Sequence, residues 1–337
     1  MVFYGKKKYM KKVILTGDRP TGPLHLGHYV GSIKNRVELQ DKYDCYFIIA
    51  DYQVLTDKVE ETKNIKDNIH NIVLDYLSLG IDPKKCSIFV ESQIPEIPQL
   101  SLIFSMLTTF ARVKRNPTIK EQIQAMGIKN ESLGYISWPV TQAADILSVR
   151  ADLVPVGKDQ LPHIEMTREI AHKFNNTFDN VFNLPEPKLG DFPTLPGLDG
   201  QKMSKSRGNA IFLTDSPKVV GEKLMKAITD PKKIRIDDPG RPNVCNIYKY
   251  YEAFYPEVAK DISEKCRKGE LGCVACKKDI SKLINEFLDP IREKRNKFAK
   301  EKGLVESILE EGRRKTSKRS KETLELVKQA MRIEYRF

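Results

Sequence analysis

An apolar run that ends in a turn and continues as a helix constrains the fold of this chain most strongly. Residues 13–15 (Val-Ile-Leu) form the short run typical of a strand buried on both faces of a parallel sheet. Residues 16–23 are dense in Gly, Pro, Thr and Asp, which favour turns. Apolar residues then recur at helical spacing from about Leu24 to Val37. A strand, turn and helix in this order direct free N–H groups and the positive helix end at a phosphate.

Strand-like runs alternate with helical patterns over the first 195 residues or so. The expected strands are residues 13–16, 45–50, 87–91 and 152–155, and the expected helices between them include 62–79 and 97–109. This alternation predicts an α/β fold with a doubly wound, Rossmann-type parallel sheet, in which ligands bind at the carboxyl ends of the strands. After residue 206 the pattern is helical almost throughout, which predicts an all-helical C-terminal domain.

We place the α/β domain at residues 13–208 and the helical domain at residues 209–302. A last helix, at about residues 317–332, is expected to pack back on the α/β domain. The C-terminal segment of about 303–337 would thereby complete that domain.

Two short signatures far apart in the sequence together indicate an ATP site. In His-Leu-Gly-His at 25–28, His25 and His28 share a helix face and can donate to phosphate oxygens, while Gly27 lets a purine or ribose approach. Lys-Met-Ser-Lys-Ser at 202–206 lies in a polar loop flanked by glycines, which suits a strap that carries charge to a polyphosphate. When a carboxylate attacks the α-phosphate, charge builds on the leaving pyrophosphate, and lysines there stabilise the transition state. Together the signatures predict an enzyme that adenylates a carboxylate, although each alone is more often a solvated surface feature.

Length and charge agree with such an enzyme. A chain of 337 residues normally makes more than one domain, and the formal net charge of +12 fits a partner with a phosphate backbone. Much of this charge follows about Lys218. No apolar run is long enough to cross a bilayer, and no signal-type apolar segment follows the basic residues 1–12. We therefore expect a cytoplasmic protein with no membrane contact.

The cysteines carry a second signal. Cys45 and Cys86 lie in or next to strand-like runs and are expected to be inert. The other four follow the spacing C-x20-C-x6-C-x2-C and are Cys245, Cys266, Cys273 and Cys276. Four clustered cysteines in a cytosolic protein indicate a metal more often than a disulfide. Zinc held by four thiolates and a [4Fe-4S] cluster are both candidates, and spacing alone does not separate them.

The two signatures resemble the HIGH and KMSKS motifs of class I aminoacyl-tRNA synthetases. The flanking segments 16–22, 27–32, 142–147 and 154–160 are similar to those of tryptophanyl-tRNA synthetases, and the similarity runs from about Val13 to the C-terminal helices. The resemblance implies that L-tryptophan and ATP, with Mg²⁺, form tryptophanyl-adenylate and pyrophosphate, after which tRNA(Trp) is charged. It also implies a homodimer, anticodon binding by the helical domain, and a [4Fe-4S] cluster on the four cysteines, with Zn²⁺ as the alternative.

The resemblance also implies a role for each site residue. The catalytic residues are His25, His28, Lys202 and Lys205. ATP contacts are implied for Arg19, Pro20, Thr21, Gly27, His28, Gly157, Lys158, Asp159, Leu195, Lys202, Met203, Ser204, Lys205 and Ser206. Tryptophan contacts are implied for Leu15, Gln53, Gln142, Asp145, Val154, Val156 and Gln160. Asp145 would accept the indole N–H, which is a donor only, and a carboxylate left unpaired would reject phenylalanine.

Two alternatives stay open. A Gln-x-x-Asp pair such as Gln142 and Asp145 also occurs in tyrosyl-tRNA synthetases, where it can meet a phenol. Many tryptophanyl enzymes carry Gln, His and Met where this chain has Arg19, Gln53 and Gln142, which indicates a variant branch of that family. The second alternative is a synthetase-like RNA-binding module without catalysis, and the intact signatures argue against it.

Overall fold

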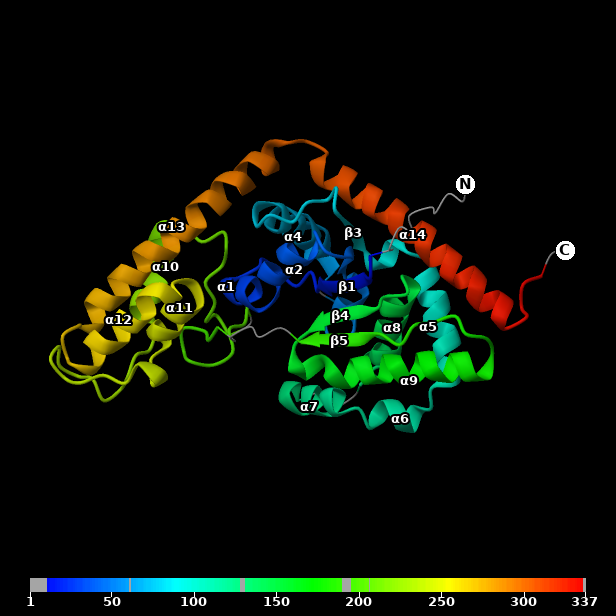
Figure 1. Ribbon diagram of the computed structural model, residues 1–337, viewed down its shortest axis with the longest axis horizontal. Helices are drawn as coiled ribbons and strands as arrows, with labels where there is room; N and C mark the ends of the chain where they lie inside the picture. The colour runs from blue at the N-terminus through cyan, green and yellow to red at the C-terminus, as the bar shows by residue number, and fades with distance from the viewer. Residues whose placement is uncertain (1–10, 61, 128–130, 190–194, 206, 336–337) are drawn as a thin grey trace, which may run out of the picture.

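The computed structural model describes residues 11–60, 62–127, 131–189, 195–205 and 207–335. Within these residues the centre of the molecule is a five-stranded sheet in which all neighbouring strands are parallel, as predicted (Figure 1). The strand order is β3-β2-β1-β4-β5. The strands β2 and β3 therefore lie on one side of β1, and β4 and β5 lie on the other, so the strand order reverses between β1 and β4. The strands are β1 (Val13–Asp18), β2 (Asp44–Ile49), β3 (Cys86–Val90), β4 (Leu153–Val156) and β5 (Glu186–Leu189).

Helices cover both faces of the sheet, as a doubly wound fold requires. The side chains of β1 divide accordingly: Ile14 packs into one hydrophobic core, and Val13 and Leu15 pack into the other. The first core includes residues of α2 (Lys34–Leu39) and α4 (Ile65–Ser78). The second includes residues of α5 (Glu96–Leu107), α8 (Leu133–Ser148) and α9 (Leu161–Thr177). The predicted helices 62–79 and 97–109 are thus present with bounds shifted by a few residues.

Several short elements connect the strands and helices. They are α1 (Leu26–His28), a π-helical turn (Tyr29–Ile33), α3 (Asp51–Leu55), α6 (Phe110–Lys114), α7 (Pro117–Met126) and 3₁₀ turns at Thr62–Asn64, Glu91–Gln93, Lys158–Gln160 and Pro242–Val244. No helix among the described residues combines the length and the apolar character needed to span a bilayer.

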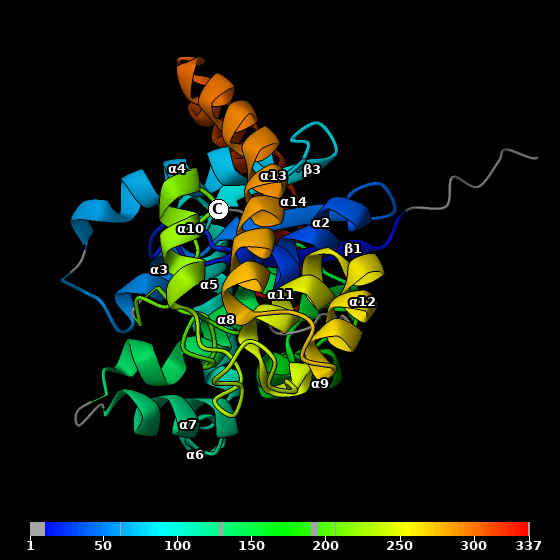
Figure 2. The ribbon, with the colours of Figure 1, turned by 90° about the vertical axis from the view of Figure 1, so that its left-hand side faces the viewer.

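The region after the lysine signature is helical, as predicted. It contains α10 (Pro217–Lys226), α11 (Asn246–Phe254), α12 (Pro256–Arg267) and α13 (Cys273–Lys300). The long helix α13 contacts α10 and α11 and also reaches α4 beside the sheet (Figures 1 and 2). The helical region therefore touches the α/β part directly.

The last helix, α14 (Leu304–Ala330), begins earlier than the predicted residue 317. Gly303, with φ of 77°, separates it from α13 in a left-handed conformation that glycine adopts without strain. The helix packs on β3, where a Cβ at Gly312 would lie 1.7 Å from the carbonyl oxygen of Ile88. Ser87 Oγ donates to the carbonyl of Gly312 at 3.0 Å. Glycine allows this close approach, so the C-terminal helix returns to the sheet as predicted.

The strand β5 was not predicted. Its sequence, Glu-Pro-Lys-Leu, lacks the β-branched and aromatic residues that mark a strand, and proline cannot donate to a ladder. The strand lies at the edge of the sheet beside β4, where proline is tolerated.

Candidate active site

A cavity of about 450 Å³ opens at the carboxyl ends of β1 and β4, where the strand order reverses. Ligands of open parallel sheets bind at this point. The predicted site residues that line the cavity are Leu15, Arg19, Thr21, His28, Gln53, Gln142, Asp145, Val154, Val156, Gly157 and Gln160. The fold thus brings predicted ATP-binding and tryptophan-binding residues into one space.

The other predicted residues do not line this cavity. Those in the described chain are Pro20, His25, Gly27, Lys158, Asp159, Leu195, Lys202, Met203, Ser204 and Lys205, and Ser206 lies outside the described residues. Pro20 lines a smaller cavity of about 210 Å³, and Leu195 is buried before the lysine loop. Lys158 and Asp159 form the 3₁₀ turn that follows β4.

The two signatures meet in space. A Cβ placed on Gly27 would lie 3.4 Å from the Cβ of Met203, so the lysine loop packs directly on the histidine segment. Lys205 Nζ donates to the carbonyl of Gly22 at 2.7 Å, in the turn that precedes the histidines. An isolated antiparallel bridge also pairs His25 with Phe212. Positions about 180 residues apart in sequence therefore form one unit.

The two histidines are neutral hydrogen-bond donors. Their rings lie 3.7 Å apart, and His28 Nδ1 accepts the backbone N–H of His25 at 3.1 Å, so the proton of His28 is on Nε2. Burial, followed by the charges of His28 and Lys205, lowers the pKa of His25 to about 3. Burial also lowers the pKa of His28 to about 4, although Asp18 opposes the shift. Both rings therefore offer N–H groups, rather than a fixed charge, near neutral pH.

Lys205 is a partly buried cation. Burial lowers its pKa from 10.5 to about 8, although Asp18 and Asp75 favour its charge, and Arg19 adds to the lowering. The positive charge of such a lysine is only partly balanced by its neighbours, so an approaching anion stabilises it, which suits binding of a polyphosphate. Lys202, the other signature lysine, is exposed on the same loop.

Sequence reasoning missed a buried network that supports the end of β1. Arg36 Nη1 donates to Asp18 Oδ2 at 2.6 Å, and Arg36 Nη2 donates to the carbonyl of Gly17 at 2.9 Å. Tyr76 Oη donates to the same carboxylate at 2.5 Å. Burial alone would raise the pKa of Asp18, but Arg36, His28 and Tyr76 lower it to about 2. Asp18 and Arg36 line the cavity, so a fixed ion pair holds its wall.

A buried carboxyl group that can still accept a hydrogen bond lies at the other end of the cavity. Asp145 on α8 is 4% exposed, and its Oδ1 has no hydrogen-bond partner among the described residues. Gln142, one turn earlier, likewise has an unpartnered amide oxygen. A buried acceptor without a donor is unfavourable, so this end of the cavity suits a ligand that brings an N–H or O–H group.

Glu91, which follows β3, is a second buried carboxyl that sequence reasoning missed. It is fully buried. Burial raises its pKa well above the ordinary value, the nearby carboxyls of Asp145 and Asp51 raise it further, and the backbone N–H groups of Gln53 and Tyr52 oppose the rise. Burial also raises the pKa of Asp145, with Asp51 adding to the shift. The only sequence signal for Glu91 was its position at the end of the strand-like run of residues 87–91.

The family model described as tRNA synthetases class I (W and Y) matches residues 7–289. The chain belongs to that family of class I tRNA synthetases. A tryptophan–tRNA ligase of Streptococcus pyogenes is 46% identical over 340 residues, which cover 96% of this chain and 99% of the relative. One from Aquifex aeolicus is 36% identical over 392 residues, which cover 95% and 99%. The crystal structure of tryptophanyl-tRNA synthetase from Campylobacter jejuni complexed with ADP and tryptophan matches with a TM-score of 0.85 at 33% identity, covering 95% of this chain and 99% of that one.

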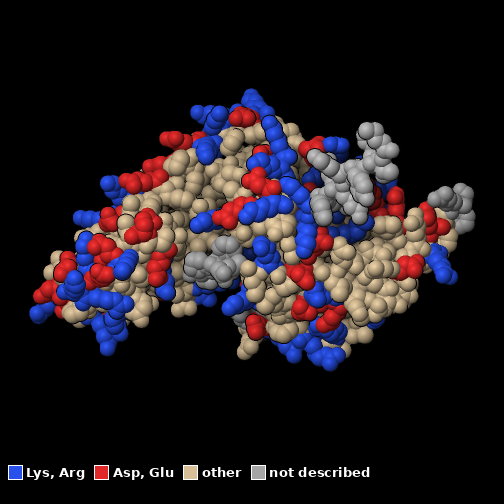
Figure 3. Space-filling view, viewed as in Figure 1, with Lys and Arg blue, Asp and Glu red and all other residues tan. Residues whose placement is uncertain are grey.

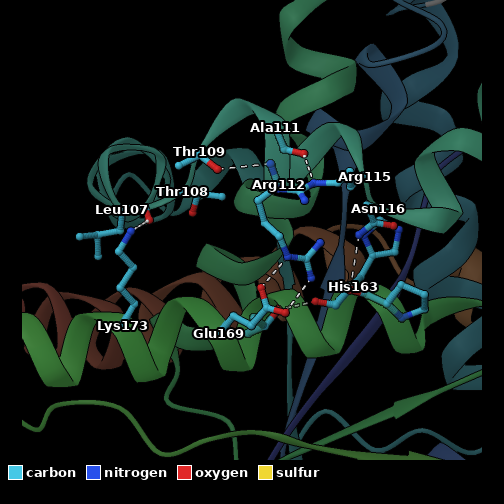
Figure 4. Close-up of polar contacts among 12 residues, drawn as sticks. Leu107, Thr108, Thr109, Ala111, Arg112, Arg115, Asn116, His163, Glu169 and Lys173 are labelled. Atoms are coloured by element: carbon cyan, nitrogen blue, oxygen red, sulfur yellow. Dashed lines mark hydrogen bonds and ion pairs between the residues drawn. The ribbon is translucent and has the colours of Figure 1, made fainter.

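In this synthetase, short helices brace the turn that carries Lys158 and Asp159. Figure 4 shows α6 tied to α9 by Arg112, whose Nε and Nη2 each donate to Glu169 at 2.7 Å. Thr118 at the start of α7 donates to the carbonyl of Asp159 at 2.9 Å. The side chain of Asp159 accepts from Gln160 at 3.2 Å. These contacts hold the turn at the edge of the cavity, where Gln160 is part of the lining.

The four clustered cysteines of the synthetase are free, half-buried thiols. Cys245 precedes α11, Cys266 lies near the end of α12, and Cys273 and Cys276 lie in the first turn of α13. They are electrostatic neighbours: burial and the other three thiols raise the pKa of Cys276 to about 12, although a hydrogen bond with Tyr251 opposes the rise. However, no three His, Cys, Asp or Glu side chains in the described part of the chain are arranged to hold a metal ion. The four predicted ligands are therefore electrostatic neighbours in the described chain without forming a site for a single metal ion.

Proposed function

We infer that this synthetase is a tryptophan–tRNA ligase. It activates L-tryptophan with ATP, releases pyrophosphate and transfers the aminoacyl group to tRNA(Trp). The observation that carries the inference is one cavity lined both by His28, whose segment packs against the lysine loop, and by Asp145, one carboxyl oxygen of which has no partner among the described residues. The identity of 36% and more to tryptophan–tRNA ligases over almost the whole chain supports the same substrate.

Tryptophan occupies the end of the cavity beside Asp145 in this proposal. The indole N–H donates to that carboxylate, which satisfies the buried acceptor and selects against phenylalanine. Leu15, Val154 and Val156 supply apolar walls for the ring. Gln160 accepts from the ammonium group, and Gln53 and Gln142 complete the pocket.

ATP occupies the end beside the turn and the lysine loop. The ribose lies near Gly157, Lys158 and Asp159, and the adenine packs against Gly27. The remaining ATP contacts are assigned to Arg19, Pro20, Thr21, Leu195, Met203, Ser204 and Ser206. Mg²⁺ would bind the phosphates of the nucleotide, and we assign it no protein ligand.

Adenylation needs no covalent nucleophile on the protein. The tryptophan carboxylate attacks the α-phosphate, the bond to the β-phosphate breaks, and pyrophosphate leaves with the electron pair. His25 and His28 donate N–H groups to the phosphates, and Lys202 and Lys205 neutralise the charge that develops on the leaving group. The terminal ribose hydroxyl of tRNA(Trp) then displaces AMP.

ATP–pyrophosphate exchange tests this function. Exchange that depends on tryptophan, with none for tyrosine or phenylalanine, is the expected result. Exchange with tyrosine would instead identify the chain as a tyrosyl-tRNA synthetase. No exchange with any of the three would favour a synthetase-like RNA-binding module instead.

We place the anticodon-binding domain at residues 209–302 and the catalytic domain at residues 13–208, completed by α14. Basic side chains, with acidic ones between them, lie along the helical region and around the centre of the molecule (Figure 3), and the basic ones can contact a tRNA phosphate backbone. The reaction is assigned to the cytoplasm.

For the four thiols of this domain we propose a [4Fe-4S] cluster, with a single zinc ion as the alternative. They interact electrostatically, yet no three of them are arranged for one ion among the described residues. A cluster binds each thiolate through a different iron atom, so it accepts wider spacing than zinc, whose Zn–S bonds are about 2.3 Å. Cys245, Cys266, Cys273 and Cys276 would hold it, and it would brace the surface that meets the anticodon.

Cys273→Ser tests the cluster. The variant is expected to lose visible absorbance and iron, and to lose tRNA charging more than ATP–pyrophosphate exchange. A colourless protein with stoichiometric zinc would establish the alternative metal. Equal loss of charging and exchange would count against a role at the anticodon, and Cys45→Ala, in β2, is the control.

We assign a homodimer interface to the apolar surface of α5, α6 and the start of α8. Leu102, Met106, Phe110 and Leu133 are each more than 60% exposed there. Exposed apolar residues grouped in this way mark interaction surfaces. Light scattering tests the assignment, because Met106→Asp is expected to shift the mass from two chains to one.

A further inference from the structure

The lysine loop is held at its base by a helix of the C-terminal helical region. The loop begins as a hairpin in which Pro196 and Lys202 pair, and Gly197 N–H donates to the carbonyl of Gln201 at 2.7 Å. Three successive carbonyls of the first strand, those of residues 196–198, face α11. All three accept hydrogen bonds from side chains of that helix.

Two side chains one helical turn apart make these contacts. Asn246 Nδ2 donates to the carbonyl of Gly197 at 3.0 Å and to that of Leu198 at 3.3 Å. Tyr250 Oη donates to the carbonyl of Pro196 at 3.1 Å. Asn246 is 6% exposed and Tyr250 is fully buried, so water does not replace these donors readily.

The base of the loop is connected rigidly to its lysines. Asn209 accepts the backbone N–H of Ser204 at 2.8 Å and donates to the carbonyl of Lys202 at 3.2 Å. Its own carbonyl accepts from Leu198 N–H at 2.9 Å, beside the contact of Asn246. A displacement at residues 196–198 is therefore transmitted to the backbone at Lys202 and Ser204.

We propose that Asn246 and Tyr250 are positioning residues for adenylation, which hold the lysine loop in register with the histidine segment. The role rests on the proposed function, because it concerns the charge that Lys202 and Lys205 bring to the leaving pyrophosphate. Neither residue lines the cavity. They act through the backbone of residues 196–198, so they affect the transition state more than tryptophan binding.

Asn246→Ala, Tyr250→Phe and the double variant test this role. Tyr255→Phe is the matched control, because it removes a hydroxyl at the end of the same helix that donates to the carbonyl of Leu283 at 2.6 Å, away from the loop. We expect the double variant to lower kcat for tryptophan-dependent exchange roughly tenfold. Its dissociation constant for tryptophan, measured by equilibrium dialysis, should match that of the control.

Limited trypsin digestion supplies a readout that does not depend on activity. Cleavage after Lys202, Lys205 and Arg207 is expected to accelerate severalfold in the double variant and to stay unchanged in the control. Unchanged kcat and unchanged cleavage would overturn the proposal, as would a fall in kcat that only parallels lost tryptophan binding and lowered Tm. If the wild-type chain showed no tryptophan-dependent exchange, the proposed function would fail, while the cleavage rates would still decide whether the helix holds the loop.

Discussion

The partly buried Lys205 predicts that ATP binding weakens as the solution becomes alkaline. Its pKa is lowered to about 8 in the free enzyme, mainly by burial. The side chain is ~90% charged at pH 7 and ~10% charged at pH 9 for a group with that pKa. If only the charged form binds the polyphosphate, the KM for ATP rises about tenfold over this range, which corresponds to ~1.4 kcal/mol.

The assay is tryptophan-dependent ATP–pyrophosphate exchange at pH 7 to 9 with saturating tryptophan. A terminal phosphate loses its last proton near pH 6, so the nucleotide itself does not titrate in this range. His25 and His28, with pKa values of about 3 and about 4, do not contribute either. The rise in KM for ATP is therefore assigned to the lysine.

Lys205→Arg is the decisive control, because a guanidinium stays charged throughout this range. Its absolute KM is expected to differ from wild type, but the KM should not rise between pH 7 and pH 9. A constant KM in the wild type, or the same slope in the arginine variant, would refute the reasoning.

Three further predictions concern the pocket and the core. Asp145→Ala removes the carboxyl acceptor and leaves the indole N–H without a partner, which costs about 1–3 kcal/mol, so the KM for tryptophan should rise roughly 5- to 150-fold with that for ATP unchanged; a change below threefold would exclude a bond to the indole. Glu91→Gln should raise Tm at pH 7, because the pKa of Glu91 is raised in the folded protein. Above about pH 4.5 the unfolded chain ionises Glu91 while the buried group stays protonated, so the wild type loses stability as the pH rises. The two proteins should melt alike below about pH 4, and a difference in Tm that is independent of pH would contradict this origin. Gly312→Ala should lower Tm by about 3–10 °C, because its Cβ would overlap the Ile88 carbonyl, whereas Gly221→Ala, which meets only the Ser281 hydroxyl at 3.4 Å, should not.

Local patterns were sufficient to predict the parts of the fold that bury apolar side chains in a regular period. The run at residues 13–15 predicted β1 because a central parallel strand is apolar on both faces, and both hydrophobic cores receive its side chains. The same logic missed β5, since an edge strand needs fewer apolar residues. It also shortened α14, because Gly312 interrupts the helical pattern in the N-terminal half of that helix.

Contacts between distant residues account for most of what was missed in the site. Asp18, Arg36 and Tyr76 form one buried network, yet each residue by itself is unremarkable in its segment. Glu91 is significant only because the fold buries it near Asp145. In contrast, the histidine and lysine signatures could be recognised because each has its own short pattern, and the fold then places Met203 on Gly27.

The helical region contacts both halves of the candidate ATP site, by separate routes. Asn246 reaches the lysine loop through the carbonyls of Gly197 and Leu198. On α13, Arg295 Nε donates to Asp75 Oδ1 at 2.7 Å, and Asp75 Oδ2 accepts the N–H of Leu24, directly before the histidine signature, at 3.3 Å.

Asp75 is fully buried on α4, and burial raises its pKa while Arg295 opposes the shift. Removal of the helical region would therefore leave a buried carboxyl group without its cation, as well as a lysine loop without its donors. A movement of α11 and α13 as one body would shift both signatures together, because each is hydrogen-bonded to that body. Beside the direct contacts between the histidine and lysine segments, helices that contribute no residue to the cavity thus support both signatures.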